Sequence, residues 1–194
     1  MITSFAKIVI VLGILRQALG LQQVPPNMVL NGIAILLTIY VMAPVAMEAG
    51  DTLTKNGYSF SSFKKFEDVE TIYNAVSTPW NSFLMKHSSV ENRNFFIRSA
   101  QRLWPQERAQ SLKETDWLVV APAFVVTEIS EAFRIGFMLF LVFLLVDMIV
   151  AAVLLALGMA MVAPTIIALP FKILLFVILD GWTRLLQGLI LNYQ

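Results

Sequence analysis

The side chains that could carry out chemistry are few, and their types exclude most catalytic and metal sites. The 194-residue sequence has no cysteine and a single histidine, His87. Disulfides, thiolate nucleophiles and Cys- or His-based metal sites within the chain are therefore excluded, and only carboxylate sites for hard cations remain. The carboxylates lack a convergent spacing with a nucleophile or base. We predict no enzymatic activity, no cofactor and no metal site, and we expect His87 to be a surface residue.

Three charged residues stand in or beside very apolar sequence. Between Ile135 and Leu179 the charged residues are Asp147 and Lys172, and Asp180 follows directly. A charge in lipid costs at least about 2.5 kcal/mol, so such residues should face a partner, a cavity or another subunit. A hairpin reversed near Met159 brings Asp147 and Lys172 to nearly the same depth, so they could form an ion pair. We favour structural pairing over proton handling for these three residues.

A second polar group precedes this stretch. Glu128, Glu131 and Arg134 are spaced i, i+3 and i+6 on an expected helix, which places them on one face where local ion pairs can form. Two interpretations stay open, a solvated helix edge and a polar seam between subunits.

The composition indicates that lipid is a component of the solvent around the elements that hold these residues. The chain is 58% hydrophobic and only 14% charged, and its mean hydropathy is +0.74. A soluble domain has about a quarter charged residues, and a disordered chain has the opposite balance. The net charge of +1 excludes the basic excess needed to bind nucleic acid.

The charges divide the chain into three segments: residues 1–47 are apolar, residues 48–116 are polar, and residues 117–194 are apolar again. In the first segment, 8–15 is too short to cross a bilayer, whereas 28–47 is long enough. The Gly, Pro and Asn residues of 20–27 predict a reversal between them. We expect an N-terminal helical hairpin, with Pro44 kinking or ending its second helix.

The polar segment should form three short helices. Apolar residues at spacings of three and four, from Phe63 and Phe66 onward, predict an amphipathic helix. Thr78-Pro79 is typical of an N-cap and the first helical position. Ser88 with Glu91 is a capping-box pattern that opens a helix, and Pro105 should stop it.

The last segment is long enough for two spans, with a reversal between Gly158 and Pro164 and a bend at Pro170. Arg16 and Lys172 flank the two short connectors without a neighbouring acid, which favours cytoplasmic connectors and an external polar segment. The fold class is therefore an all-α membrane protein with two long helical hairpins and a small helical extracytoplasmic insert.

Several motifs, in the same order along the chain, resemble the FliP/SctR family. They are Thr3-Ser-Phe, Ile8 to Gly20, Gln22-Gln-Val-Pro-Pro-Asn27, Pro122-Ala-Phe with Glu128 to Gly136, Leu155 to Met159, and Ala168-Leu-Pro-Phe-Lys172 to Asp180-Gly-Trp182. The resemblance covers both apolar segments, and residues 22–26 look more like the injectisome branch than the flagellar one.

The resemblance implies a core subunit of the type III secretion export gate, through which unfolded proteins cross the bacterial inner (cytoplasmic) membrane. It implies a homo-oligomer, a pentamer, that joins SctS/FliQ-like and SctT/FliR-like subunits and an SctU/FlhB-like switch protein. The protein should be multi-pass, with some of the assembly on the periplasmic side. The family has a further apolar segment before Thr-Ser-Phe, so we expect a segment upstream of Met1.

The same resemblance suggests that Met159 and Met161 form the pore constriction. Unbranched, polarizable methionine side chains can seal a narrow pore and still rearrange around varied peptides. The alternative is a methionine-bearing helix turn packed in lipid or protein. Arg16, Glu128, Glu131, Arg134, Asp147, Lys172 and Asp180 should then make polar contacts between subunits or within a hairpin.

One other function class remains open. A small multi-spanning ion or proton-coupled transporter would use Asp147 and Lys172 as its relay. It would work when purified without partner subunits, so the mass of the detergent-extracted particle separates the two hypotheses.

Overall fold

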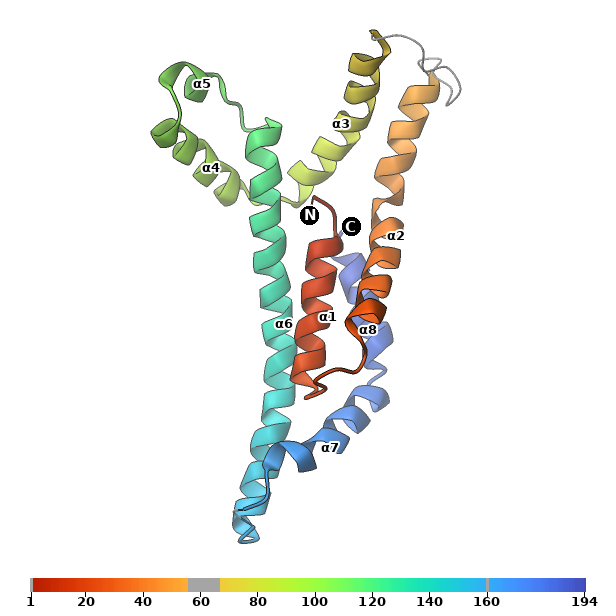
Figure 1. Cartoon of the computed structure of the whole chain (residues 1–194), viewed down its shortest axis with the longest axis vertical. Helices are drawn as coiled ribbons and strands as arrows, with labels where there is room; N and C mark the ends of the chain where they lie inside the picture. Colours follow the sequence, from red (N-terminus) through yellow and green to blue (C-terminus); the bar gives the residue numbers. More distant parts are fainter. Residues whose placement is uncertain (1, 56–66, 160) are drawn as a thin grey trace. The chain divides into compact units, whose positions relative to one another are not determined.

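The structure, a computed structural model, describes residues 2–55, 67–159 and 161–194, and within these ranges it is built of eight helices without strands (Figure 1). The helices are α1 (Phe5–Ala18), α2 (Asn27–Lys55), α3 (Glu67–His87), α4 (Val90–Leu103), α5 (Gln106–Ser111), α6 (Trp117–Ala156), α7 (Pro164–Ile178) and α8 (Gly181–Leu191). The predicted fold class, an all-α membrane protein, is confirmed.

The chain divides into two compact units. We call Lys7–Leu37 with Ser130–Gln194 the hairpin unit, and Met1–Ala6 with Thr38–Ile129 the polar unit. Helices α2 and α6 contribute residues to both.

In the hairpin unit, α1 lies beside α6 (Figure 1), and the two helices approach closely at Gly136, where Ile14 packs against the bare backbone. The unit has an apolar core made by α1, α6, α7 and α8. In this core the ring of Phe176 contacts two other aromatic rings, with its centroid 6.2 Å from that of Phe143 and 5.5 Å from that of Trp182. Leu15, Ala18 and Leu19 are buried in the same cluster.

Within the described chain, α2 and α6 are the two helices that are each long and apolar enough to span a membrane. At 40 residues, α6 is roughly 60 Å long by its rise per residue, which exceeds the roughly 30 Å of a hydrocarbon core. The pair α7 and α8 passes the same test only together, with a bend of 61° between them. With 14 residues, α1 is shorter than a span, as expected.

The reversals follow the turn residues of the sequence. Gly20 and Gly158 have positive φ angles of 80° and 74°, which a side chain would strain. Pro164 stands in the first turn of α7, where its missing N–H costs no helical hydrogen bond. The chain therefore reverses between α1 and α2 and between α6 and α7, where the sequence predicts it.

Four prolines, Pro44, Pro79, Pro122 and Pro170, stand inside helices that continue past them, and two of these bear on the predicted helix ends. Helix α2 continues past Pro44 to Lys55, and α3 contains Pro79, so a helix start at Thr78-Pro79 is a wrong prediction. Thr78 instead donates its hydroxyl to the Asn74 carbonyl at 2.8 Å, inside the helix.

Helix α4, in the polar unit, has its N-cap one residue later than predicted. Ser89, not Ser88, is the N-cap, because its hydroxyl accepts from the Asn92 backbone N–H. The Thr127 hydroxyl of α6 accepts from the Ser89 backbone and from the Asn92 side chain at 3.0 and 2.8 Å. Helix α4 ends before Pro105, as predicted. Phe63 and Phe66 lie outside the described residues.

Candidate functional site

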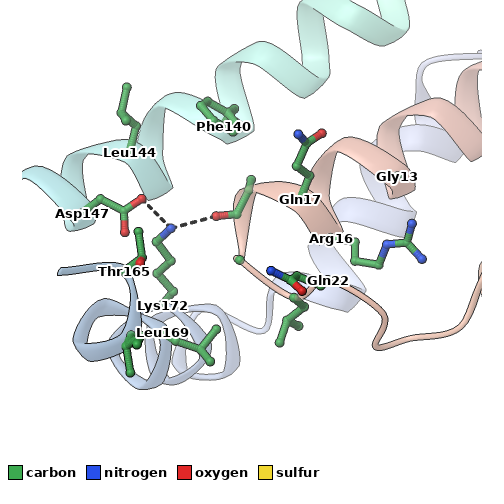
Figure 2. A pocket seen from close by; sticks show the side chains of 14 residues that line it. Gly13, Arg16, Gln17, Gln22, Phe140, Leu144, Asp147, Thr165, Leu169 and Lys172 are labelled. Carbon is green, nitrogen blue, oxygen red and sulfur yellow. Dashed lines mark hydrogen bonds and ion pairs between the residues drawn. The ribbon is translucent and has the colours of Figure 1, made fainter. Parts of the chain in front are cut away.

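The central polar site of the hairpin unit is an ion pair between α6 and α7. Lys172 donates from Nζ to Oδ2 of Asp147 at 2.7 Å. The same ammonium donates to the backbone carbonyl of Ala18, at the end of α1, at 3.0 Å. Figure 2 shows both contacts converging on one nitrogen. One cation therefore joins three helices.

This ion pair is largely withdrawn from solvent. The side chain of Lys172 is 7% exposed and that of Asp147 is 25% exposed. Breaking such a pair strands a charge in low dielectric, so each partner requires the other. The second carboxylate oxygen of Asp147, Oδ1, is buried and has no hydrogen-bond partner in the described chain.

A cavity of about 650 Å³ adjoins the pair. Its lining combines polar groups, among them Gln17, Gln22 and Thr165, with apolar side chains of α6 and α7 such as Leu144 and Leu169. Arg16 also lines the cavity, and Figure 2 shows its guanidinium turned away from Asp147.

Arg16 fastens the turn that follows α1. Its Nη1 donates to the Pro25 carbonyl at 3.2 Å and to Oδ1 of Asn27 at 2.6 Å. Both acceptors lie in the connector to α2 or at its start. The contacts of Arg16 are therefore local to the first hairpin.

Glu131 makes an ion pair that the sequence pattern did not indicate. Its Oε2 accepts from Nζ of Lys7 at 2.6 Å, and the Lys7 side chain is 1% exposed. Lys7 is a cation in the otherwise apolar beginning of α1. That isolated charge is the one signal in the sequence that could have pointed to Lys7.

Glu128 and Arg134 lie in contrasting surroundings. Glu128 is fully buried, whereas Arg134 is exposed. The helical spacing sets a common face, but the ion-pair partner described for Glu131, Lys7, comes from α1.

Asp180 occupies the N-cap position of α8 in a left-handed conformation, with φ of 52°. Its Oδ1 accepts from the Thr183 hydroxyl at 3.0 Å, and its side chain is exposed. Asp180 therefore belongs to the bend between α7 and α8.

The two methionines assigned to the constriction stand in the loop between α6 and α7. Met161 is 100% exposed and Met159 is 45% exposed in the single chain. The backbone N–H of Met159 donates to the Leu154 carbonyl at 2.9 Å, which anchors the loop to the end of α6. Large apolar side chains left so exposed are suited to contacts with other molecules.

His87 is half-buried at the end of α3, with its ring 4.7 Å from that of Phe83. The portion of the chain that the structure describes holds no group of three or more His, Asp or Glu side chains that could bind a metal ion.

Comparison with known proteins gives a consistent result along the chain. The FliP family matches residues 1–189. The chain is 50% identical over 193 residues to "Pathogenicity-related ORF2" of Xanthomonas campestris pv. glycines, which covers all of this chain and 88% of that relative. It is 48% identical to "Hypersensitivity response secretion protein HrcR" of Ralstonia nicotianae and 45% identical to "Yop proteins translocation protein R" of Yersinia pestis, with the same coverage. The resemblance drawn from the sequence motifs is confirmed, and the chain belongs to the FliP family.

Proposed function

We propose that this protein is a core subunit of the export gate of a type III secretion system, through which unfolded proteins cross the inner membrane. The observation that carries this proposal is the match over residues 1–189 to the FliP family, with relatives at 45–50% identity named for secretion, translocation or pathogenicity. Those names favour the injectisome branch.

A gate subunit requires partners, and the surface of the single chain fits that requirement. Helix α6 exposes a series of large apolar side chains, among them Phe137, Leu145 and Val153. Lipid and neighbouring helices are the two surroundings in which such a surface is stable. We assign it to a homo-oligomer, a pentamer, with SctS/FliQ-like and SctT/FliR-like subunits and an SctU/FlhB-like protein beside it.

The proposed location is the bacterial inner membrane, with residues 48–116 as the periplasmic insert between hairpins 1–47 and 117–194. The spanning length of α2 and α6 supports a multi-pass protein. The larger share of charged side chains in 48–116 supports contact of that segment with water.

Within the gate, we assign the pore constriction to Met159 and Met161. Their exposure in the single chain supports a place where several copies meet. Lys172 and Asp147 would hold the α6–α7 hairpin that presents this loop, because their ion pair ties the two helices together. The Oδ1 atom of Asp147 would remain an acceptor for a donor from another subunit.

The remaining polar residues would support that arrangement. Arg16 and Asp180 would shape the connectors that they occupy. Glu128, Glu131 and Arg134 would form the polar face of α6, with the exposed Arg134 available to a neighbouring subunit.

The experiment is deletion of the gene and complementation in trans, with secreted proteins measured in the culture medium. Loss of secretion on deletion and recovery with the wild-type gene are the expected results. Secretion that continues after deletion would contradict the proposal. If the protein were instead a transporter of small ions, deletion of its gene would leave secretion intact.

A further inference from the structure

Lys7 is a buried lysine whose position in the fold needs an explanation. Its side chain is 1% exposed, and it is one of the largest fully buried side chains among the described residues. Burial of an ammonium group costs several kcal/mol unless paired and hydrogen-bonded groups compensate for the lost water. The partners of Lys7 therefore indicate what its burial achieves.

These partners lie far from Lys7 in the sequence. From Nζ, Lys7 donates to Oε2 of Glu131 in α6 at 2.6 Å and to Oδ1 of Asn192 at 2.8 Å. The same nitrogen lies 4.4 Å from the ring centroid of Tyr193, in cation–π distance. The ammonium thus joins the first turn of α1, the middle of α6 and the residues that follow α8.

Asn192 and Tyr193, which directly follow α8, both contact the ammonium of Lys7. Because the two contacts come from consecutive residues, they fix the direction of this carboxy-terminal segment as well as its location. The backbone of the segment is bonded to α8, because the N–H groups of Asn192 and Tyr193 donate to the Gly188 and Ile190 carbonyls, both at 3.1 Å, and that of Gln194 donates to the Leu191 carbonyl at 3.2 Å. The side chains of Asn192 and Tyr193 contact Lys7 of α1.

The position of Asn192 also bears on a cavity. A largely apolar cavity of about 510 Å³ lies among α6, α7 and α8, and Asn192 lines it together with Gly188 and Leu189 of α8. A change in the direction of the terminal segment would move one end of this cavity wall.

We propose that Lys7 is a positioning residue that clasps the carboxy-terminal segment 192–194 against α1 and α6, and that this clasp fixes the end of α8. Glu131 holds the ammonium in place from the other side. These contacts lie within one chain, and the clasp is additional to the proposed role in secretion.

The test measures how tightly the terminal segment is held. Because the sequence has no cysteine, Ser130→Cys and Gln194→Cys, both exposed sites of the hairpin unit, accept one nitroxide label each. Electron paramagnetic resonance then gives the distance distribution between the labels in detergent, with unlabelled protein in excess so that distances within one chain are measured. We expect a single narrow distribution for the chain with Lys7.

Four variants in the labelled chain distinguish the clasp from general destabilisation. Lys7→Met removes the cation, and Asn192→Leu with Tyr193→Leu removes the tail contacts while leaving Lys7 and Glu131 intact. Both should lose the narrow distribution. Lys7→Arg, which keeps a donor cation, should retain it, and so should Arg184→Met, which removes an exposed cation beside the same cavity.

The tail-side variant decides the outcome even where Lys7→Met fails to fold. A narrow distribution in the folded Asn192→Leu/Tyr193→Leu protein would overturn the proposal. A broad distribution in Asn192→Leu/Tyr193→Leu, together with a narrow distribution in Lys7→Arg, would support the proposal.

Discussion

The ammonium of Lys172 lies 2.7 Å from the carboxylate of Asp147, and the two residues belong to the two helices that flank the methionine loop. The same ammonium donates to the Ala18 carbonyl. A side chain near the carboxy-terminal end of the chain is thereby bonded both to its hairpin partner and to the first helix. This relationship makes the α6–α7 hairpin a defined unit that can present Met159 and Met161.

Removal of one partner of this pair should be costly. Lys172→Ala should lower the free energy of unfolding by about 3–5 kcal/mol, because it leaves the Asp147 carboxylate uncompensated in a largely buried site. Thermal unfolding of the purified protein in detergent measures the effect. The double variant Lys172→Met/Asp147→Leu should be much milder, because it removes both charges. Equal losses in the single and double variants would contradict the pairing.

The constriction assignment predicts leakage. Met159→Ala and Met161→Ala together should raise ion flux through the assembled complex in liposomes, because two alanines leave a gap that flexible thioether side chains fill. The matched control is Met138→Ala, an exposed methionine of α6 outside the loop, which should leave the flux unchanged. An unchanged flux in the loop variant would remove the role of these methionines.

Gly136 should tolerate no side chain. A Cβ atom added at Gly136 would meet the Ile14 side chain, and the Cβ of Ile14 would lie only 3.1 Å from it. Gly136→Ala should therefore destabilise the protein by about 1–3 kcal/mol through overpacking. Gly13→Ala is the control, because a Cβ there meets no atom within 4 Å, and alanine is the better helix former by about 1 kcal/mol. Thermal unfolding compares the two variants. Equal stability would argue against the close approach of α1 and α6.

Arg93 should be the main polar link of the insert. It is buried and donates from Nη1 to the Ser88 carbonyl at 2.6 Å and from Nε to Glu114 at 2.9 Å. Arg93→Ala should lower the free energy of unfolding by about 1–3 kcal/mol, because a buried acceptor loses its donor. The exposed Arg98 on the same helix is the control, and Arg98→Ala should change stability by less than about 0.5 kcal/mol. Similar effects from both substitutions would contradict this assignment.

The sequence predicts the features that depend on local chemistry. The turn residues place the reversals near Gly20 and between Gly158 and Pro164, and the long apolar runs give α2 and α6. The opposite charges in apolar sequence indicate Asp147 and Lys172, because charges in such surroundings need partners. These inferences require no knowledge of contacts between distant segments.

Features that depend on tertiary packing could not be predicted in this way. The contact of Lys7 with Asn192 joins residues 185 positions apart, and no periodic pattern encodes it. Two adjacent serines made the cap ambiguous, and Thr127 of α6 contacts Ser89 and Asn92. Pro79 is compatible with a helix start in isolation, yet α3 continues through it.

The central claim, that this FliP-family chain acts as a gate subunit, is tested most directly by the mass of the particle that contains it. The measurement is native mass spectrometry of the complex extracted from its own membrane in mild detergent. The account predicts a particle with several copies of this 21.7 kDa chain together with other membrane proteins. A particle of one or two copies alone would contradict it.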